Sequence, residues 1–193
     1  MARRVRNTVA LALLGAVLAA AGGCGSEETI RVDLLPPGNA RGAAASGLYA
    51  WSETVSSSSC AATVTVGAAT VALPQREHEW SACVDVVHDE GYYAADFFGF
   101  TGAAGVARPG YNADGGLWQE GQYRIGGLFA FGTGVTARAL IDGQYLPPAG
   151  TEVVRSFEGV GLVQVFATEG GRERYLCQYN VTFNGHREPG CGE

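Results

Sequence analysis

The clearest structural signal in the chain lies at residues 160–183, VGLVQVFATEGGRERYLCQYNVTF. Apolar or aromatic residues occupy every other position in its second half, at Tyr175, Cys177, Tyr179, Val181 and Phe183. A period of two that is sustained for about nine residues is typical of a strand with one buried face. Glu169-Gly170-Gly171 separates this strand from the apolar run at 160–168. The stretch therefore predicts a long antiparallel hairpin.

Shorter segments upstream repeat this alternation. Residues 62–73 alternate around a two-residue turn at Gly67-Ala68, and residues 81–88 place Ala82, Val84, Val86 and His88 on one face. Residues 135–146 predict a hairpin that is closed by a type I′ turn at Asp142-Gly143. Many short strands with frequent turn signals predict an all-β fold, an antiparallel β-sandwich or jelly-roll-like domain.

The segment from Tyr92 to Trp118 has the weakest pattern. Tyr93, Phe97 and Phe100 fit one helical stripe, and glycines with Pro109 follow, so we expect a short helix or a long loop here. Aromatic side chains are concentrated in and near this segment. They either fill a core, which is the favoured interpretation, or form a ligand surface; they are Tyr92, Tyr93, Phe97, Phe98, Phe100, Tyr111, Trp118 and Tyr123.

The N-terminus has the pattern of an export signal. Arg3, Arg4 and Arg6 precede an uncharged run at 9–21 of mostly Ala, Leu, Val and Gly. A helix of this run would reach about 20 Å, which is short of the roughly 30 Å hydrocarbon core of a membrane. We therefore expect a cleaved signal helix instead of a transmembrane anchor.

The signal ends in Ala21-Gly22-Gly23-Cys24, which resembles the lipobox of a bacterial lipoprotein signal peptide. The resemblance implies that the Cys24 thiol receives a diacylglycerol and that the chain is cut just before this residue. It departs from the family at Ala21, where leucine is preferred. The alternative is ordinary signal peptidase cleavage, which leaves Cys24 free or disulfide-bonded.

Three regions follow from these signals: a lipoprotein signal peptide at 1–23, a lipid-anchored tether at 24–47, and one disulfide-stapled β domain at 48–193. The tether includes a candidate first strand at 30–35, where Ile30, Val32 and Leu34 alternate with polar residues. The 170 residues after the signal suffice for a single core.

The charge of the chain restricts its partners. Its formal net charge is −6, which becomes −9 when the three signal arginines are removed. This argues against nucleic acid and anionic lipid headgroups as partners, because both require clustered cations. The chain also contains no lysine. It therefore cannot form a P-loop, a lysine Schiff base or a Ser-Lys dyad.

Four cysteines besides Cys24 suit two disulfides in an oxidising compartment: Cys60, Cys83, Cys177 and Cys191. Three connectivities are possible, and the most local one, Cys60 to Cys83 with Cys177 to Cys191, is favoured. No C-x-x-C spacing occurs, so zinc and thioredoxin-like chemistry lack their usual signature.

Two motifs resemble cofactor sites without their required context. The sequence GTGVTA at 132–137 matches a dinucleotide fingerprint but lacks a βαβ unit, so a glycine-rich turn between strands is expected. Asn112, Asp114 and Glu120 suggest a calcium loop, but the EF-hand register places glycines at the first and last ligand positions. An irregular Ca²⁺ site is the alternative to a solvated turn. We predict no cofactor and no metal site.

Two histidines stand beside carboxylates, His78 between Glu77 and Glu79, and His88 before Asp89-Glu90. Each suits a structural imidazole as well as a catalytic base. Neither H-E-x-x-H nor G-x-S-x-G occurs, and no catalytic residue is assigned. The sequence predicts a membrane-anchored bacterial envelope lipoprotein, facing the periplasm or the exterior, with a domain for structure or for binding an unknown protein or carbohydrate. The alternative is an exported hydrolase that uses His78 or His88 with nearby carboxylates.

Overall fold

The computed structural model describes residues 29–32, 35–42, 44–103, 105–106, 108, 110–148 and 153–192. These residues form an all-β protein, as predicted. In chain order the strands are β1 (Gly47–Ser58), β2 (Thr63–Val66), β3 (Ala69–Ala72), β4 (Glu79–Asp89), β5 (Tyr92–Gly102), β6 (Tyr111–Leu117), β7 (Gln122–Gly132), β8 (Val135–Leu146), β9 (Ser156–Glu169) and β10 (Arg172–Arg187). No helix in the described ranges is long and apolar enough to cross a membrane. Cys24 and the signal segment lie outside these ranges.

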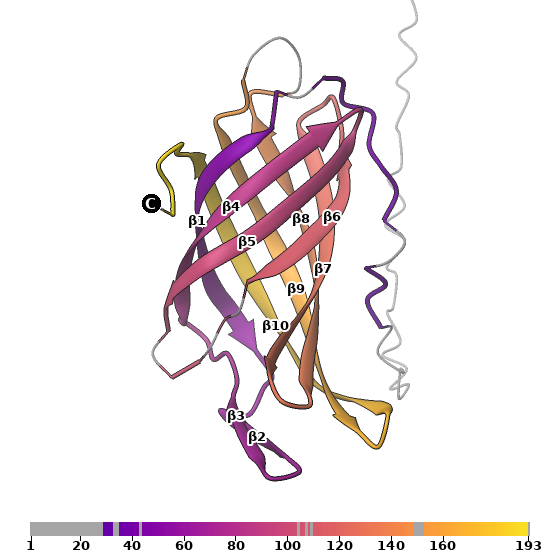
Figure 1. Ribbon diagram of the computed structural model, residues 1–193, viewed down its shortest axis with the longest axis vertical. Helices are drawn as coiled ribbons and strands as arrows, with labels where there is room; N and C mark the ends of the chain where they lie inside the picture. Colours follow the sequence, from indigo (N-terminus) through magenta and orange to yellow (C-terminus); the bar gives the residue numbers. More distant parts are fainter. Residues whose placement is uncertain are drawn as a thin grey trace, which may run out of the picture.

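Eight of the strands form one closed antiparallel barrel in the order β1-β10-β9-β8-β7-β6-β5-β4 (Figure 1). Closure occurs at β1, which pairs with β4 along one edge and with β10 along the other, where Trp51 faces Gly185. The expected two-layer sandwich is thus replaced by a single rolled sheet. Alternation predicts strands with one buried face, but it does not say whether that face is covered by a second sheet or by the same sheet curling round.

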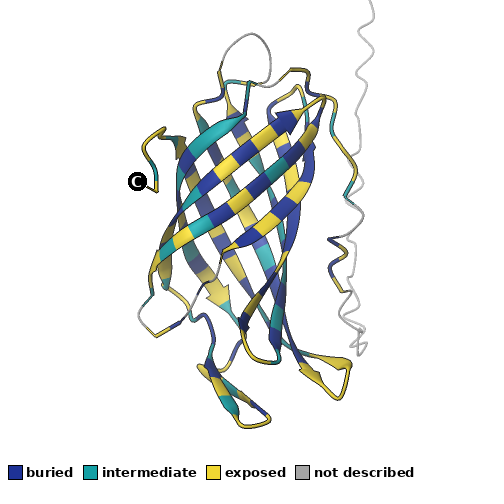
Figure 2. Ribbon diagram, viewed as in Figure 1, coloured by how far each residue is buried: buried dark blue, intermediate teal, exposed yellow. Residues whose placement is uncertain are grey.

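Buried and exposed residues alternate along the strands, as Figure 2 shows. In β4, Trp80, Ala82, Val84, Val86 and His88 are all buried, and the residues between them are less buried or exposed. The one-face pattern predicted for 81–88 is therefore confirmed. The alternation predicted for 175–183 is confirmed from Cys177 to Phe183 in β10, whose turn to β9 lies at Gly170-Gly171. It is wrong at Tyr175, because a register shift between Tyr175 and Cys177 interrupts the alternation.

The predicted hairpin at 62–73 is confirmed as β2 and β3. Val66 pairs with Ala69, which leaves Gly67-Ala68 as the turn, and Gly67 has a φ of 59° that favours glycine. This hairpin connects β1 to β4 and projects beyond one end of the barrel (Figure 1).

The prediction of a helix or long loop at Tyr92 to Trp118 is wrong, because this segment contains β5 and β6. Tyr93, Ala95 and Phe97 alternate into the barrel. Gly99, with a φ of 64°, then interrupts the register opposite Ser81 to Cys83, and Phe100 packs against the core again. This irregularity creates the spacing that resembled a helical stripe.

The turn predicted at Asp142-Gly143 is also wrong, because β8 continues through it and pairs with β7 and β9 on both sides. A Cβ at Gly143 would lie 2.5 Å from the Tyr123 ring and 2.1 Å from the Glu158 carbonyl oxygen. Glycine is needed here because a neighbouring inward ring occupies the space of a side chain. It does not mark a turn.

Residues 29–32 and 35–42, here called the strap, run along the outer wall of the barrel without forming a strand. The strand expected at 30–35 is therefore absent from the described residues, and positions 33 and 34 lie outside them. Gly116 and Gly126 leave room for the strap on β6 and β7, since a Cβ on either would approach Pro36 or Val32 to 3.0 Å or less. The strap is held by hydrogen bonds from the Gly38 N–H to the Gly91 carbonyl and from the Ala40 N–H to the Leu117 carbonyl.

Candidate functional site

The interior of the barrel is filled with aromatic side chains. Phe157 lies among four tyrosine rings, with centroid distances of 5.0 to 6.0 Å to Tyr49, Tyr93, Tyr123 and Tyr145. These five side chains are at most 2% exposed. An eight-stranded barrel is just wide enough for side chains to fill it, and contacts of this geometry stabilise such packing.

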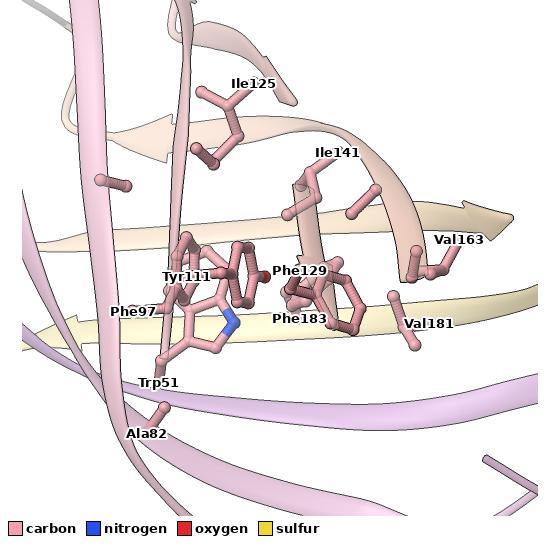
Figure 3. Packing of buried hydrophobic residues seen from close by; sticks show 14 of the residues in the cluster. Trp51, Ala82, Phe97, Tyr111, Ile125, Phe129, Ile141, Val163, Val181 and Phe183 are labelled. Atoms are coloured by element: carbon pink, nitrogen blue, oxygen red, sulfur yellow. The ribbon is translucent and has the colours of Figure 1, made fainter. Parts of the chain in front are cut away.

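A second aromatic group fills the middle of the barrel (Figure 3). Trp51 contacts Phe97 edge-on and Phe183 at a tilt, at 5.4 and 5.3 Å. Phe97 and Tyr111 stack at 4.6 Å, and Phe129 lies 4.9 Å from Tyr111. Tyr93, Phe97, Tyr111 and Tyr123 are thus core residues, as favoured from the sequence. Tyr92 is exposed on the outer wall.

A buried ion pair lies inside this aromatic core. Arg108, in the connection between β5 and β6, donates to Glu53 Oε2 at 2.8 Å and to the Tyr179 hydroxyl at 3.0 Å. Both charged side chains are 1% exposed. The guanidinium also lies 4.7 to 5.6 Å from four rings, those of Trp80, Phe100, Tyr111 and Phe129. Sequence reasoning did not identify Glu53 or Arg108, because neither belongs to a motif.

Burial and charge act in opposite directions on this pair. Burial raises the pKa of the Glu53 carboxyl above its ordinary value, and the adjacent Arg108 lowers it in part. Burial also disfavours the charge of Arg108, but Glu53 and Tyr179 outweigh it and raise the arginine's pKa overall. The guanidinium therefore stays protonated inside the barrel.

The two histidines considered as catalytic candidates lie near opposite ends of β4. Ten residues of extended chain separate them, which corresponds to roughly 33 Å. The main-chain N–H of Gln75 donates to His78 Nδ1 at 3.3 Å, and the His78 ring contacts Trp80. Asp85 points away from both rings on the outer wall, and Glu90 pairs with Arg41. The structure therefore does not bring these candidates together.

His88 lies inside one end of the barrel and is 2% exposed. Among the described side chains, none hydrogen-bonds to either ring nitrogen. Ser46 Oγ accepts a hydrogen bond from the His88 main-chain N–H, not from the ring. Burial lowers the pKa of His88, while Asp89, Glu90 and the Ala40 main chain act in the opposite direction. This environment is that of a neutral core imidazole, and in the described part of the chain no hydroxyl or thiol is hydrogen-bonded to the ring.

Four cysteines form two disulfides, but the local connectivity predicted from the sequence is wrong. Cys60 is bonded to Cys177, and Cys83 to Cys191. Closure of the barrel brings the end of β1 beside β10, where the Ser59 N–H donates to the Gln178 carbonyl. Cys83 is joined by the C-terminal segment that follows β10. Sequence distance could not predict this pairing, because it depends on how the sheet closes.

The remaining candidate motifs lie on turns and on the outer wall. Thr133-Gly134, within the 132–137 motif, makes the tight turn from β7 to β8, as expected for a glycine-rich turn. Asn112 and Asp114 point outward from β6, and Asp114 accepts a hydrogen bond from Tyr92. Among the described residues, no group of three or more His, Cys, Asp or Glu side chains could hold a metal ion.

Two hollows lie on the surface of the described part of the protein. One of 700 Å³ opens at the end of the barrel, between the turns that contain Gly67, Gly134 and Gly170. Another of 310 Å³ lies beside the disulfide of Cys83 and Cys191. These surfaces are therefore open to a partner, whereas the centre of the barrel is occupied by side chains.

No protein-family model, curated protein or solved structure matches this chain. The function is therefore inferred from the residues of this chain and their geometry.

Proposed function

We infer that this protein is a bacterial envelope lipoprotein whose barrel is a binding or structural module that acts through its outer surface. The lipobox resemblance at Ala21 to Cys24 supports the anchor. The two disulfides fit an oxidising compartment, extracellular or periplasmic. Lipid on Cys24 would fix the domain to the surface of a membrane.

The filled interior of the barrel is the observation that favours the outer surface as the place where a partner or ligand binds. Barrels that enclose a ligand leave space between their walls, whereas this one packs Phe157 against four tyrosines and seals an arginine among four more rings. A partner or ligand therefore meets the walls and turns of the barrel.

The hydrolase alternative gains no support from this geometry. A catalytic histidine needs a nucleophile and an orienting carboxylate within about 3 Å. His78 receives a main-chain hydrogen bond, and His88 is buried without a side-chain hydrogen-bond partner in the described part of the chain. These positions favour structural roles for both rings.

Membrane fractionation tests the anchor. The wild-type chain is compared with a version in which residues 1–24 are replaced by an ordinary cleavable export signal, so that the mature chain begins at Gly25. We expect the wild type to stay with membranes in high salt and to need detergent for release, whereas the control is soluble. A control that also needs detergent would show that Cys24 is not the anchor, and soluble wild-type protein would contradict the proposal altogether.

A further inference from the structure

The strap fixes where the lipid attachment point lies relative to the barrel. Ile30 and Val32 are 9% and 8% exposed on the outer wall, and the Ile30 N–H donates to Gln164 Oε1 of β9 at 2.7 Å. Six residues of fully extended chain, from Cys24 to Ile30, span at most about 20 Å. The lipid on Cys24 would therefore enter a membrane within about 20 Å of this point on β9.

The far side of the barrel is beyond this reach. In the closed ring of eight strands, β5 lies four strands away from β9, in both directions. Four spacings of about 4.8 Å, measured around a barrel whose strands tilt by about 40°, total roughly 25 Å, before outward side chains are added. A membrane that holds Cys24 can contact the wall of β7, β8 and β9, but it cannot contact the wall around β5.

Charge also distinguishes the two walls. The strands β4, β5 and β6 carry five carboxylates and no arginine; the acidic residues are Glu79, Asp85, Asp89, Asp96 and Asp114. The strands β7 to β9 carry two arginines, Arg124 and Arg138, against three carboxylates, which are Asp142, Glu158 and Glu169. Anionic headgroups would repel the first wall more strongly than the second. The chain as a whole is acidic, so the lipid would hold it to the membrane, and the charge distribution would select the wall.

Exposed apolar side chains lie at the same level as the strap. Leu128 on β7 is 58% exposed, and Val160 on β9 is 60% exposed. Leu128 faces Arg138 across β7 and β8, and Arg138 in turn faces Gln164, which holds Ile30. This wall therefore combines apolar groups with arginines, a composition that suits the boundary between headgroups and acyl chains.

We propose that the strap lays the barrel on its membrane with the β7–β9 wall toward the lipid and the acidic β4–β6 wall facing away. This orientation rests on the proposed lipid attachment at Cys24. The β4–β6 wall is then the surface that remains free for other molecules of the envelope.

Photocrosslinking to lipid tests this orientation. The lipidated protein carries p-benzoylphenylalanine in place of Val160, Val87 or Ala68 and is reconstituted on vesicles of phosphatidylethanolamine and phosphatidylglycerol. Val87 is a matched control, since it is a β4 valine with 56% exposure, against 60% for Val160. Ala68 reports the turn of the projecting hairpin. We expect at least fivefold more lipid adduct at Val160 than at Val87. Equal yields, or the highest yield at Val87 or Ala68, would overturn the orientation.

A strap variant separates orientation from anchoring. Ile30→Ser combined with Val32→Ser should detach the strap, so that the yields at Val160 and Val87 become similar while the protein still floats with vesicles. A preference that persists in this variant would show that the strap does not set the orientation. Wild-type protein that fails to float in high salt would instead refute the lipid anchor, and the orientation with it.

Discussion

At the scale of single residues, Arg108 places a full charge among aromatic rings. Its guanidinium is compensated by Glu53 and Tyr179 and by the faces of four rings. A buried pair of this kind contributes little net stability compared with apolar residues, yet losing one partner leaves the other charge buried and unpaired. The pair therefore holds the connection between β5 and β6 against the interior of the barrel.

The substitution Arg108→Leu should lower the free energy of unfolding by about 3 kcal/mol or more, because Glu53 is then buried without a counterion. The double variant Glu53→Leu with Arg108→Leu should recover most of this loss. Urea denaturation of both variants measures the effect. A single variant within about 1 kcal/mol of wild type would show that the pair is not sealed from water.

The lowered pKa of His88 predicts the sign of a pH effect. Because burial disfavours the charged ring, the unfolded chain binds a proton more readily than the folded chain. The stability due to the neutral ring is thus complete above the ordinary histidine pKa of about 6.5 and is lost as the pH falls toward the lower folded value.

His88→Phe should therefore weaken the loss of stability between pH 7.5 and pH 5, measured by urea midpoints. His186→Gln is the control for replacing a histidine at the surface, because His186 is exposed. An identical pH dependence in wild type and His88→Phe would contradict the buried, neutral state of the ring.

At the scale of elements, regular alternation was sufficient to predict β2, β3, β4 and β10 from Cys177 onward, and the apolar run at 160–168 predicted β9. It failed where glycine has a packing role in place of a turn role. Gly143 in β8 makes room for the Tyr123 ring, and Gly99 in β5 shifts the register of the aromatics. Both needs arise from neighbours that are distant in sequence. A single sequence does not reveal them, because glycine carries the same local signal in a turn and beside a ring.

Gly143→Ala should lower the free energy of unfolding by about 1–3 kcal/mol, since the added Cβ collides with Tyr123 and with the rigid main chain of Glu158. Gly190→Ala is the matched control, because a Cβ there meets nothing within 4 Å. It should stay within about 0.5 kcal/mol of wild type. Equal stabilities of the two variants would contradict the close approach of the Tyr123 ring and the Glu158 main chain to Gly143.

At the scale of the whole molecule, the sequence indicated that the cysteines form disulfides and that the aromatic side chains fill the core. It did not indicate which cysteine bonds to which, or which rings pack together. The disulfides join residues 117 and 108 positions apart. Closing a loop of this length removes more entropy from the unfolded chain than closing a short loop. Each disulfide is therefore expected to stabilise the fold by about 4 to 5 kcal/mol. His78 and His88 could be singled out from the sequence as candidates. Only the path of β4 shows that they lie near the opposite ends of this strand.

Mass spectrometry of unreduced tryptic peptides tests the closure of the barrel most directly. Each of the four cysteines falls on its own peptide, namely 42–76, 77–124, 175–187 and 188–193. We predict that 42–76 is linked to 175–187, because β1 lies beside β10, and that 77–124 is linked to 188–193. A link between 42–76 and 77–124, together with one between 175–187 and 188–193, would contradict the closed barrel.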